Sequence, residues 1–139
     1  MRRRDLLRVL PWLLLTPALG SEPEPPVRLL FPVTFRDRKR YRKVFLRIRG
    51  AINLWGAGAQ ILVVAYDEGI HFLDRFENGE FEERISNLML YGVEFYACEV
   101  AMRIFEVPKE ALFDGVKTVR SGFEFHVLKV REGYIPIYL

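Results

Sequence analysis

The sequence contains almost no cysteine: Cys98 is the only one among 139 residues. A single cysteine excludes an intrachain disulfide, so the fold cannot depend on a disulfide framework. The only two histidines, His71 and His126, lie at long spacing from Cys98, which is a poor pattern for a metal site. We therefore expect no metal and no cofactor, and we interpret both histidines as surface or partly packed side chains.

Motifs that bind nucleotides or activate a serine nucleophile are also missing. No Gly-x-Gly-x-x-Gly or Walker sequence occurs, and Gly56-Ala57-Gly58 precedes an apolar run, so it is expected to form a turn. There is no Gly-x-Ser-x-Gly elbow, although composition alone leaves a Ser-His-Asp triad open. Half of the residues are hydrophobic and no internal repeat is found, which indicates one globular domain.

The excess of positive charge is confined to the amino terminus. The chain has a net charge of +3, and its first 20 residues contribute all of it, because they contain four arginines and one acid, Asp5. The remainder is neutral overall, so the charge provides no argument for a nucleic-acid partner.

Residues 1–20 have the order of a signal peptide. Arg-rich residues 1–8 precede the apolar residues 9–20, and Ala18-Leu19-Gly20 provides small residues before a cleavage point. The segment around Arg3 and Arg4 is similar to a twin-arginine signal, with an Arg-rich Sec signal as the alternative. From this order we expect cleavage and export to the periplasm or beyond. Because spanning a bilayer takes roughly 20 apolar residues, we expect no stable membrane anchor.

The rest of the chain divides into a linker and a domain. Residues 21–26 are rich in Glu and Pro and are expected to form a linker, so the domain comprises residues 27–139. Within it, apolar runs predict strands at 27–33, 60–66, 93–97, 116–119 and 135–139. Helical spacing predicts helices at 41–55, 67–76, 81–89, 99–105 and 122–132, with a further turn at 109–113.

This alternation predicts an α/β fold with a mainly parallel sheet covered by helices on both faces. The helix at 122–132 is ambiguous because residues 123–127 alternate like a strand. Ser121 and Glu124 have the spacing of a capping box, however, and this favours the helix. Pro136 cannot donate a ladder hydrogen bond, so the last strand is expected at an edge of the sheet.

Cys98 directly follows one predicted strand and precedes a helix. Reactive groups gather at the carboxyl ends of parallel strands, and a helix amino terminus favours the thiolate. Glu99 opposes this effect, while Arg103 lies at ion-pair spacing from Glu99 and could partly neutralise it. His71, near the end of the second strand, is a candidate neighbour of Cys98. Position alone favours a structural role, because unpaired cysteines are among the most buried residues.

Four segments, in the same order, resemble DsrE-like proteins. Gly92-Val93-Glu94-Phe95-Tyr96-Ala97-Cys98 is similar to the family's Gly-Val-x-x-x-x-Cys segment. The other three are residues 61–66 with Gly69-Ile70, the Ser-Gly turn within residues 116–122, and Glu132-Gly133-Tyr134-Ile135.

The resemblance implies a DsrE-like, flavodoxin-like three-layer domain, usually a homo-oligomer such as a trimer or hexamer. Members with the cysteine are associated with sulfur relay, so Cys98 would carry sulfur as a persulfide between a donor and an acceptor protein, as a carrier or sulfurtransferase. Asp67-Glu68 departs from the family's His-Gly turn, so the pocket wall is expected to differ. The alternative is a non-catalytic oligomeric binding or accessory module in which Cys98 is merely packed.

A basic run remains unassigned. Residues 36–49 contain eight Lys or Arg and one acid, Asp37. The run is either the solvated face of the first helix or a docking surface for an acidic partner or an anionic sulfur compound.

Overall fold

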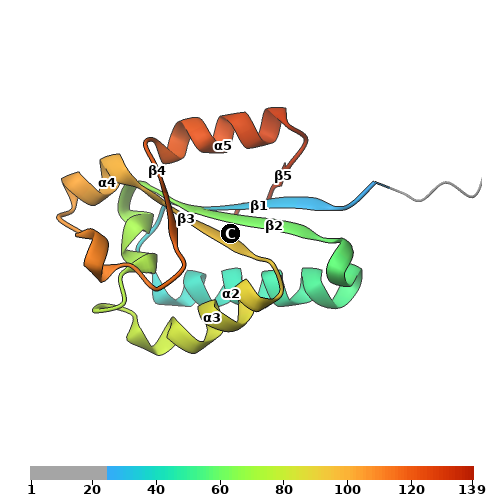
Figure 1. The fold of residues 1–139 in the computed structure, drawn as a ribbon, viewed down its shortest axis with the longest axis horizontal. Helices are drawn as coiled ribbons and strands as arrows, with labels where there is room; N and C mark the ends of the chain where they lie inside the picture. The colour runs from blue at the N-terminus through green and yellow to red at the C-terminus, as the bar shows by residue number, and fades with distance from the viewer. Residues whose placement is uncertain (1–24) are drawn as a thin grey trace, which may run out of the picture.

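Five parallel strands form one sheet in the computed structural model, which describes residues 25–139 (Figure 1). The strand order is β4-β3-β2-β1-β5, and every pairing is parallel. The strands are β1 (Arg28–Val33), β2 (Gln60–Ala65), β3 (Glu94–Cys98), β4 (Lys117–Val119) and β5 (Ile135–Pro136). The predicted signal peptide and residues 21–24 of the predicted linker lie outside the described residues.

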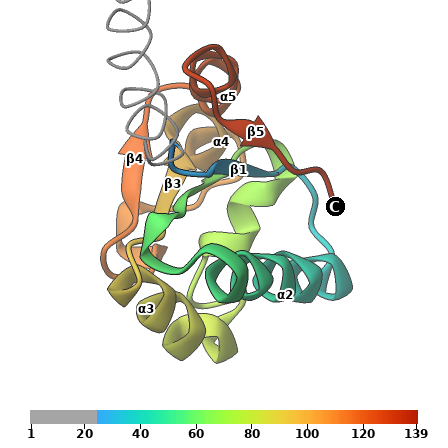
Figure 2. The ribbon, with the colours of Figure 1, turned by 90° about the vertical axis from the view of Figure 1, so that its right-hand side faces the viewer.

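Helices cover both faces of the sheet. They are α2 (Arg38–Trp55), α3 (Glu82–Leu90), α4 (Glu99–Ile104) and α5 (Gly122–Arg131). Short 3-10 helices join them: η1 (Gly56–Gly58), η2 (Asp67–Leu73), η3 (Gly79–Phe81) and η4 (Lys109–Ala111). Helices α2 and α3 lie on one face and α5 on the other (Figure 2). The predicted single-domain, three-layer α/β fold is therefore confirmed.

The two faces have cores of unequal size. On the α2 side, aromatic residues of α2 pack against the 3-10 helices: Tyr41 lies 4.7 Å from Phe72, and Phe45 lies 5.0 Å from Phe81, between ring centroids. On the α5 side, a smaller cluster is built on Leu30, Leu62 and Val64, with Phe125 and Tyr134 packed against it. The second face is thus held by fewer apolar contacts.

Several element boundaries differ from the sequence predictions. Helix α2 begins at Arg38 because the Asp37 carboxylate caps it, accepting the N–H groups of Lys39 and Arg40. The segment after β2 is a 3-10 helix that ends at Leu73, and Gly69 within it is pressed against the Val33 carbonyl, where a Cβ would stand 1.7 Å from the oxygen. This close approach leaves room only for glycine.

The carboxyl-terminal elements follow the prediction more closely. The Ser121 hydroxyl accepts the N–H of Glu124, which settles the ambiguous segment as helix α5. Strand β5 occupies an edge, as predicted, but it spans only Ile135–Pro136, where residues 135–139 were expected. Pro136 has no N–H to offer to a further strand, in keeping with its edge position, and the Ile137 N–H donates to the Leu30 carbonyl across the β1–β5 pair.

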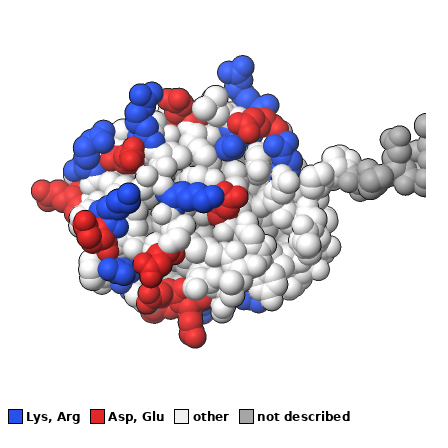
Figure 3. Space-filling view, in the orientation of Figure 1, with Lys and Arg blue, Asp and Glu red and all other residues white. Residues whose placement is uncertain are grey.

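The surface carries charges of both signs, interspersed on the face shown in Figure 3. Some of them pair: Lys117 Nζ lies 2.9 Å from a carboxylate oxygen of Glu94. Within residues 25–139, no helix has the length and apolar character needed to cross a membrane.

Candidate functional site

Cys98 occupies the junction between β3 and α4. It is the last residue of β3, in register with Val119 of β4, and it is the N-cap residue of α4. Its Sγ accepts the N–H of Ala101 at 3.5 Å, so the sulfur satisfies one of the open donors in the first turn of this helix. The predicted location at a strand end and helix start is therefore confirmed.

Cys98 is buried, although its place at a strand end would suit a reactive residue that is open to solvent. The residue is only 5% exposed. The cover is provided by the first residue of α5: a Cβ built on Gly122 would stand 3.0 Å from the Cβ of Cys98 and 2.5 Å from the Cβ of Tyr66. The chain leaving β4 crosses back over the sheet and places its Ser121-Gly122 turn directly against the cysteine.

A chain of three polar side chains lies beside this turn. The Tyr66 hydroxyl is 3.0 Å from Nδ1 of His126, and Nε2 of His126 is 2.9 Å from the Tyr138 hydroxyl. Burial lowers the pKa of His126, which favours the neutral imidazole, and a neutral imidazole accepts at one nitrogen and donates at the other. Burial also raises the pKa of Tyr66, with smaller contributions from Asp67, Tyr138 and Cys98. The site thus contains a neutral donor–acceptor chain that begins at Tyr66, beside the turn that covers Cys98.

Sequence reasoning treated His126 as one of two unremarkable histidines and missed this arrangement. The available signal was spacing, because His126 lies four residues after Gly122 and so on the same face of α5. His71, the predicted neighbour of Cys98, is buried at 8% exposure, where the sequence indicates a surface or partly packed side chain. Its ring packs edge-on against Phe105 at 5.2 Å, beside the end of α4 opposite to Cys98. That His71 adjoins Cys98 stays a prediction.

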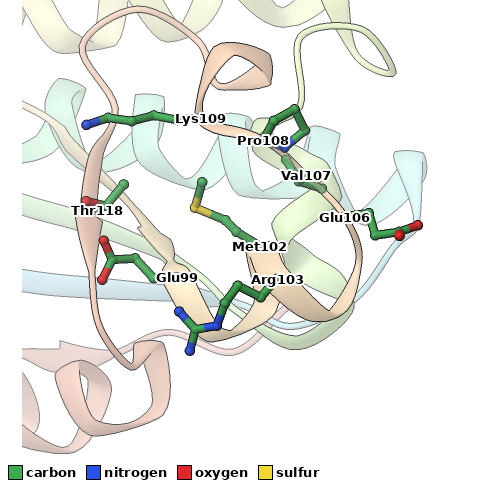
Figure 4. Close-up of a pocket in the computed structure, with 8 residues that line it drawn as sticks. All are labelled: Glu99, Met102, Arg103, Glu106, Val107, Pro108, Lys109 and Thr118. Atoms are coloured by element: carbon green, nitrogen blue, oxygen red, sulfur yellow. The ribbon is translucent and has the colours of Figure 1, made fainter.

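An open hollow lies on the outer side of α4, with a volume of about 620 Å³. Its lining residues are Glu99, Met102, Arg103, Glu106, Val107, Pro108, Lys109 and Thr118. Figure 4 shows Met102 in the middle, with Glu99, Thr118 and Lys109 to one side of it. The predicted neighbours Glu99 and Arg103 therefore face this hollow, and Cys98 is not part of its lining. No ion pair joins Glu99 to Arg103 in the part of the chain described.

Metal binding has no geometric support in the described region. Across residues 25–139, no cluster of three or more His, Cys, Asp or Glu side chains is arranged to hold an ion.

Comparison with known proteins assigns the family. A sequence model of the DsrE/DsrF-like family matches residues 34–137, which include Tyr66, Cys98 and His126. The chain belongs to the DsrE/DsrF-like family. A solved structure of the protein of unknown function MTH1491 from Methanobacterium thermoautotrophicum is 28% identical and superimposes with a TM-score of 0.75. The match covers 81% of this chain and 99% of that one. Among curated proteins, no sequence matches.

Proposed function

We propose that this protein is a sulfur carrier that holds sulfane sulfur as a persulfide on Cys98. Membership of the DsrE/DsrF-like family supports a role of the sulfur-relay type. The observation that carries the proposal is the contact between Cys98 Sγ and the Ala101 N–H at the end of β3. Backbone N–H groups at a helix start favour negatively charged sulfur, in the thiolate as well as in a terminal persulfide.

The transfer needs no added oxidant. The Cys98 thiolate attacks the outer sulfur of a donor such as thiosulfate, a new S–S bond forms, the donor's S–S bond breaks, and sulfite leaves with the electron pair. An acceptor thiolate then takes the outer sulfur in the same way and regenerates Cys98. The thiol proton leaves before the first attack, and we propose that neutral His126, which is hydrogen-bonded to Tyr66 and lies one turn after Gly122, accepts it.

The burial of Cys98 favours a second candidate function. A purely structural cysteine would also look like this: it would be buried, here at 5% exposure, and its sulfur would cap the helix that follows it. On that interpretation the protein is a non-catalytic accessory or binding module, and donors never reach the sulfur.

Intact-mass spectrometry of the native protein with thiosulfate separates the two. A carrier gains one sulfur atom, about 32 Da, and loses it again when cyanide removes sulfane sulfur. Cys98→Ser should remain unmodified, and Tyr66→Phe should gain the sulfur more slowly while keeping its fold. If wild-type protein is modified only after unfolding in denaturant, the accessory-module function replaces the carrier.

A homo-oligomer is part of the proposal. Helix α5 exposes an apolar stripe at helical spacing, with Phe123, Val127 and Val130 exposed by 65%, 43% and 39%. A stripe of this kind is typical of an interface between copies, and the family resemblance favours a trimer or hexamer. Light scattering should give a multiple of the monomer mass, and Phe123→Ser should reduce it, whereas Leu54→Ser, at a similarly exposed position on α2, should not. A wild-type monomer at micromolar concentration would contradict this.

Export completes the proposal and rests on residues 1–20 of the sequence. The expected start of the processed protein is Ser21, after Ala18-Leu19-Gly20. Amino-terminal sequencing of protein from the cell envelope tests this start. A variant with both Arg3→Lys and Arg4→Lys distinguishes the two export routes. If this variant stays unprocessed in the cell, the twin-arginine route is supported, and if it is still exported normally, the Sec route is favoured.

A further inference from the structure

A groove between α2 and α3 combines arginines with an apolar floor. Its volume is about 420 Å³. Its lining residues are Arg42, Phe45, Leu46, Arg49, Arg84 and Leu88. The four from α2 follow one another at spacings of three, one and three residues, which places them on one face of that helix, and the two from α3 lie one turn apart. Two helix faces therefore form the walls.

The arginines of this groove stand apart from the ion pairs of the described residues. Within the described residues, none of the three arginines that line the groove forms an ion pair. By contrast, Arg36, which precedes α2, pairs with Glu77, and Arg38, the first residue of α2, pairs with Glu80. Helix α2 contains no acidic residue at all.

The nearest acidic residues along α3 lie on another surface. Glu82 and Glu83 line a separate hollow, together with Gly79, Glu80 and Ser86. The two signs of charge are thus segregated around α3, and the groove keeps a strongly positive character.

The floor of the groove is apolar. Phe45 and Leu88 are 6% and 3% exposed, and the Arg84 guanidinium lies over the Phe45 ring at 5.7 Å from its centroid. Leu46, on the wall, is 72% exposed. A ligand that satisfied only the guanidinium groups would leave this apolar surface in water, while an apolar body laid along it would gain from its burial.

We propose that this groove binds a small organic anion, a carboxylate or sulfonate carried on an apolar body. The volume lies in the range of about 300–1,000 Å³ that is usual for small-molecule sites. Guanidinium groups match the paired oxygens of such anions with two parallel hydrogen bonds. The site does not depend on the sulfur-carrier function, because α2 and α3 cover the face of the sheet opposite to α5 and its contact with Cys98 (Figure 2).

Calorimetric titration of the full-length chain with decanoate, below its micelle concentration, tests the proposal. Decanol is the neutral probe of the same length and thiosulfate is the anion without an apolar body. Decanoate should bind more tightly than either. Arg42→Gln and Arg49→Gln should each weaken decanoate binding about tenfold, the cost of one lost charge-assisted hydrogen bond. Arg47→Gln removes the same charge from α2 outside the groove and should leave the affinity unchanged.

A second pair of variants tests the apolar contact. Leu46→Ser should weaken decanoate binding, whereas Leu54→Ser, at an exposed position of α2 outside the groove, should not. These side chains are exposed, so the variants should fold, which circular dichroism checks. Cys98→Ser should bind decanoate normally, so a failed sulfur-carrier test leaves this one intact. Equal binding of decanol, equal binding of thiosulfate, or an equal loss in Arg47→Gln would each overturn the proposal.

Discussion

Gly122 lies in direct contact with Cys98: a Cβ at this glycine would stand 3.0 Å from the Cβ of the cysteine. The two residues are far apart in the fold's connectivity, since one ends β3 and the other begins α5. Their contact exists because the chain must return across the sheet from the β4 edge to the β5 edge. The crossing that takes the chain from the β4 edge to the β5 edge therefore also buries the sulfur of Cys98.

Gly122→Ala should destabilise the protein. The new methyl group would meet the Cβ of Tyr66 at 2.5 Å, so the first turn of α5 must move, at a cost of about 1–3 kcal/mol in the free energy of unfolding. Gly79→Ala is the matched control, because nothing lies within 4 Å of a Cβ there. Urea denaturation of both variants measures the difference. Equal stability of the two would show that the first turn of α5 is not seated closely on Tyr66 and Cys98.

Removing the side-chain hydroxyl of Tyr41 and that of Tyr96 should affect the stability of the protein differently. The Tyr41 hydroxyl is buried without a hydrogen-bond partner among the described residues, so Tyr41→Phe should leave stability unchanged or raise it by up to about 1 kcal/mol. The Tyr96 hydroxyl donates to the Glu94 carboxylate, so Tyr96→Phe should cost about 1 kcal/mol. Thermal unfolding compares the two. A larger loss in Tyr41→Phe than in Tyr96→Phe would contradict the difference in hydrogen bonding between these two hydroxyls.

Much of the fold could be predicted from the sequence because its elements have strong local signals. The apolar run of β2 and the capping pair Ser121 and Glu124 belong to this kind. Pro136 located the edge strand through a purely local property, its missing N–H. The end of η2 at Leu73 could not be predicted, because the next residue, Asp74, forms an isolated bridge with Leu112, which is distant in the sequence.

The candidate site shows the same division. The position of Cys98 at a strand end followed from local periodicity, whereas its burial depends on the path of α5 over the sheet. The hydrogen bonds of His126 join α5 to Tyr66, which follows β2 and is 60 residues away, and to Tyr138, which follows β5. Spacing places His126 on the same face of α5 as Gly122, but the side chains that meet it there are decided by the path of the chain across the sheet.

His126 should make stability fall in mildly acidic solution. Burial holds the pKa of His126 in the folded protein below its usual value of 6.5, so the unfolded chain binds the proton first as the pH is lowered. The free energy of unfolding should therefore decrease as the pH falls below about 6.5, until the folded protein is protonated as well. Urea midpoints across this range measure the slope, and His126→Asn should flatten it. A slope that is identical in the variant would assign the effect to other groups.

The Cys98 thiol should react slowly in the native protein. Only 5% of the residue is exposed, and Gly122 and Tyr66 lie against it, so a reagent must wait for the first turn of α5 to open. A bulky aromatic disulfide reagent should label native protein at least about tenfold more slowly than unfolded protein, with iodoacetamide less affected because it is smaller. Gly122→Ala should speed native labelling, since it displaces the covering turn, while Gly79→Ala should not. Cys98 is the only cysteine, so Cys98→Ser gives the background directly. Labelling at the same rate in native and unfolded protein would mean that the sulfur is open to solvent and that the turn at Gly122 does not limit access to it.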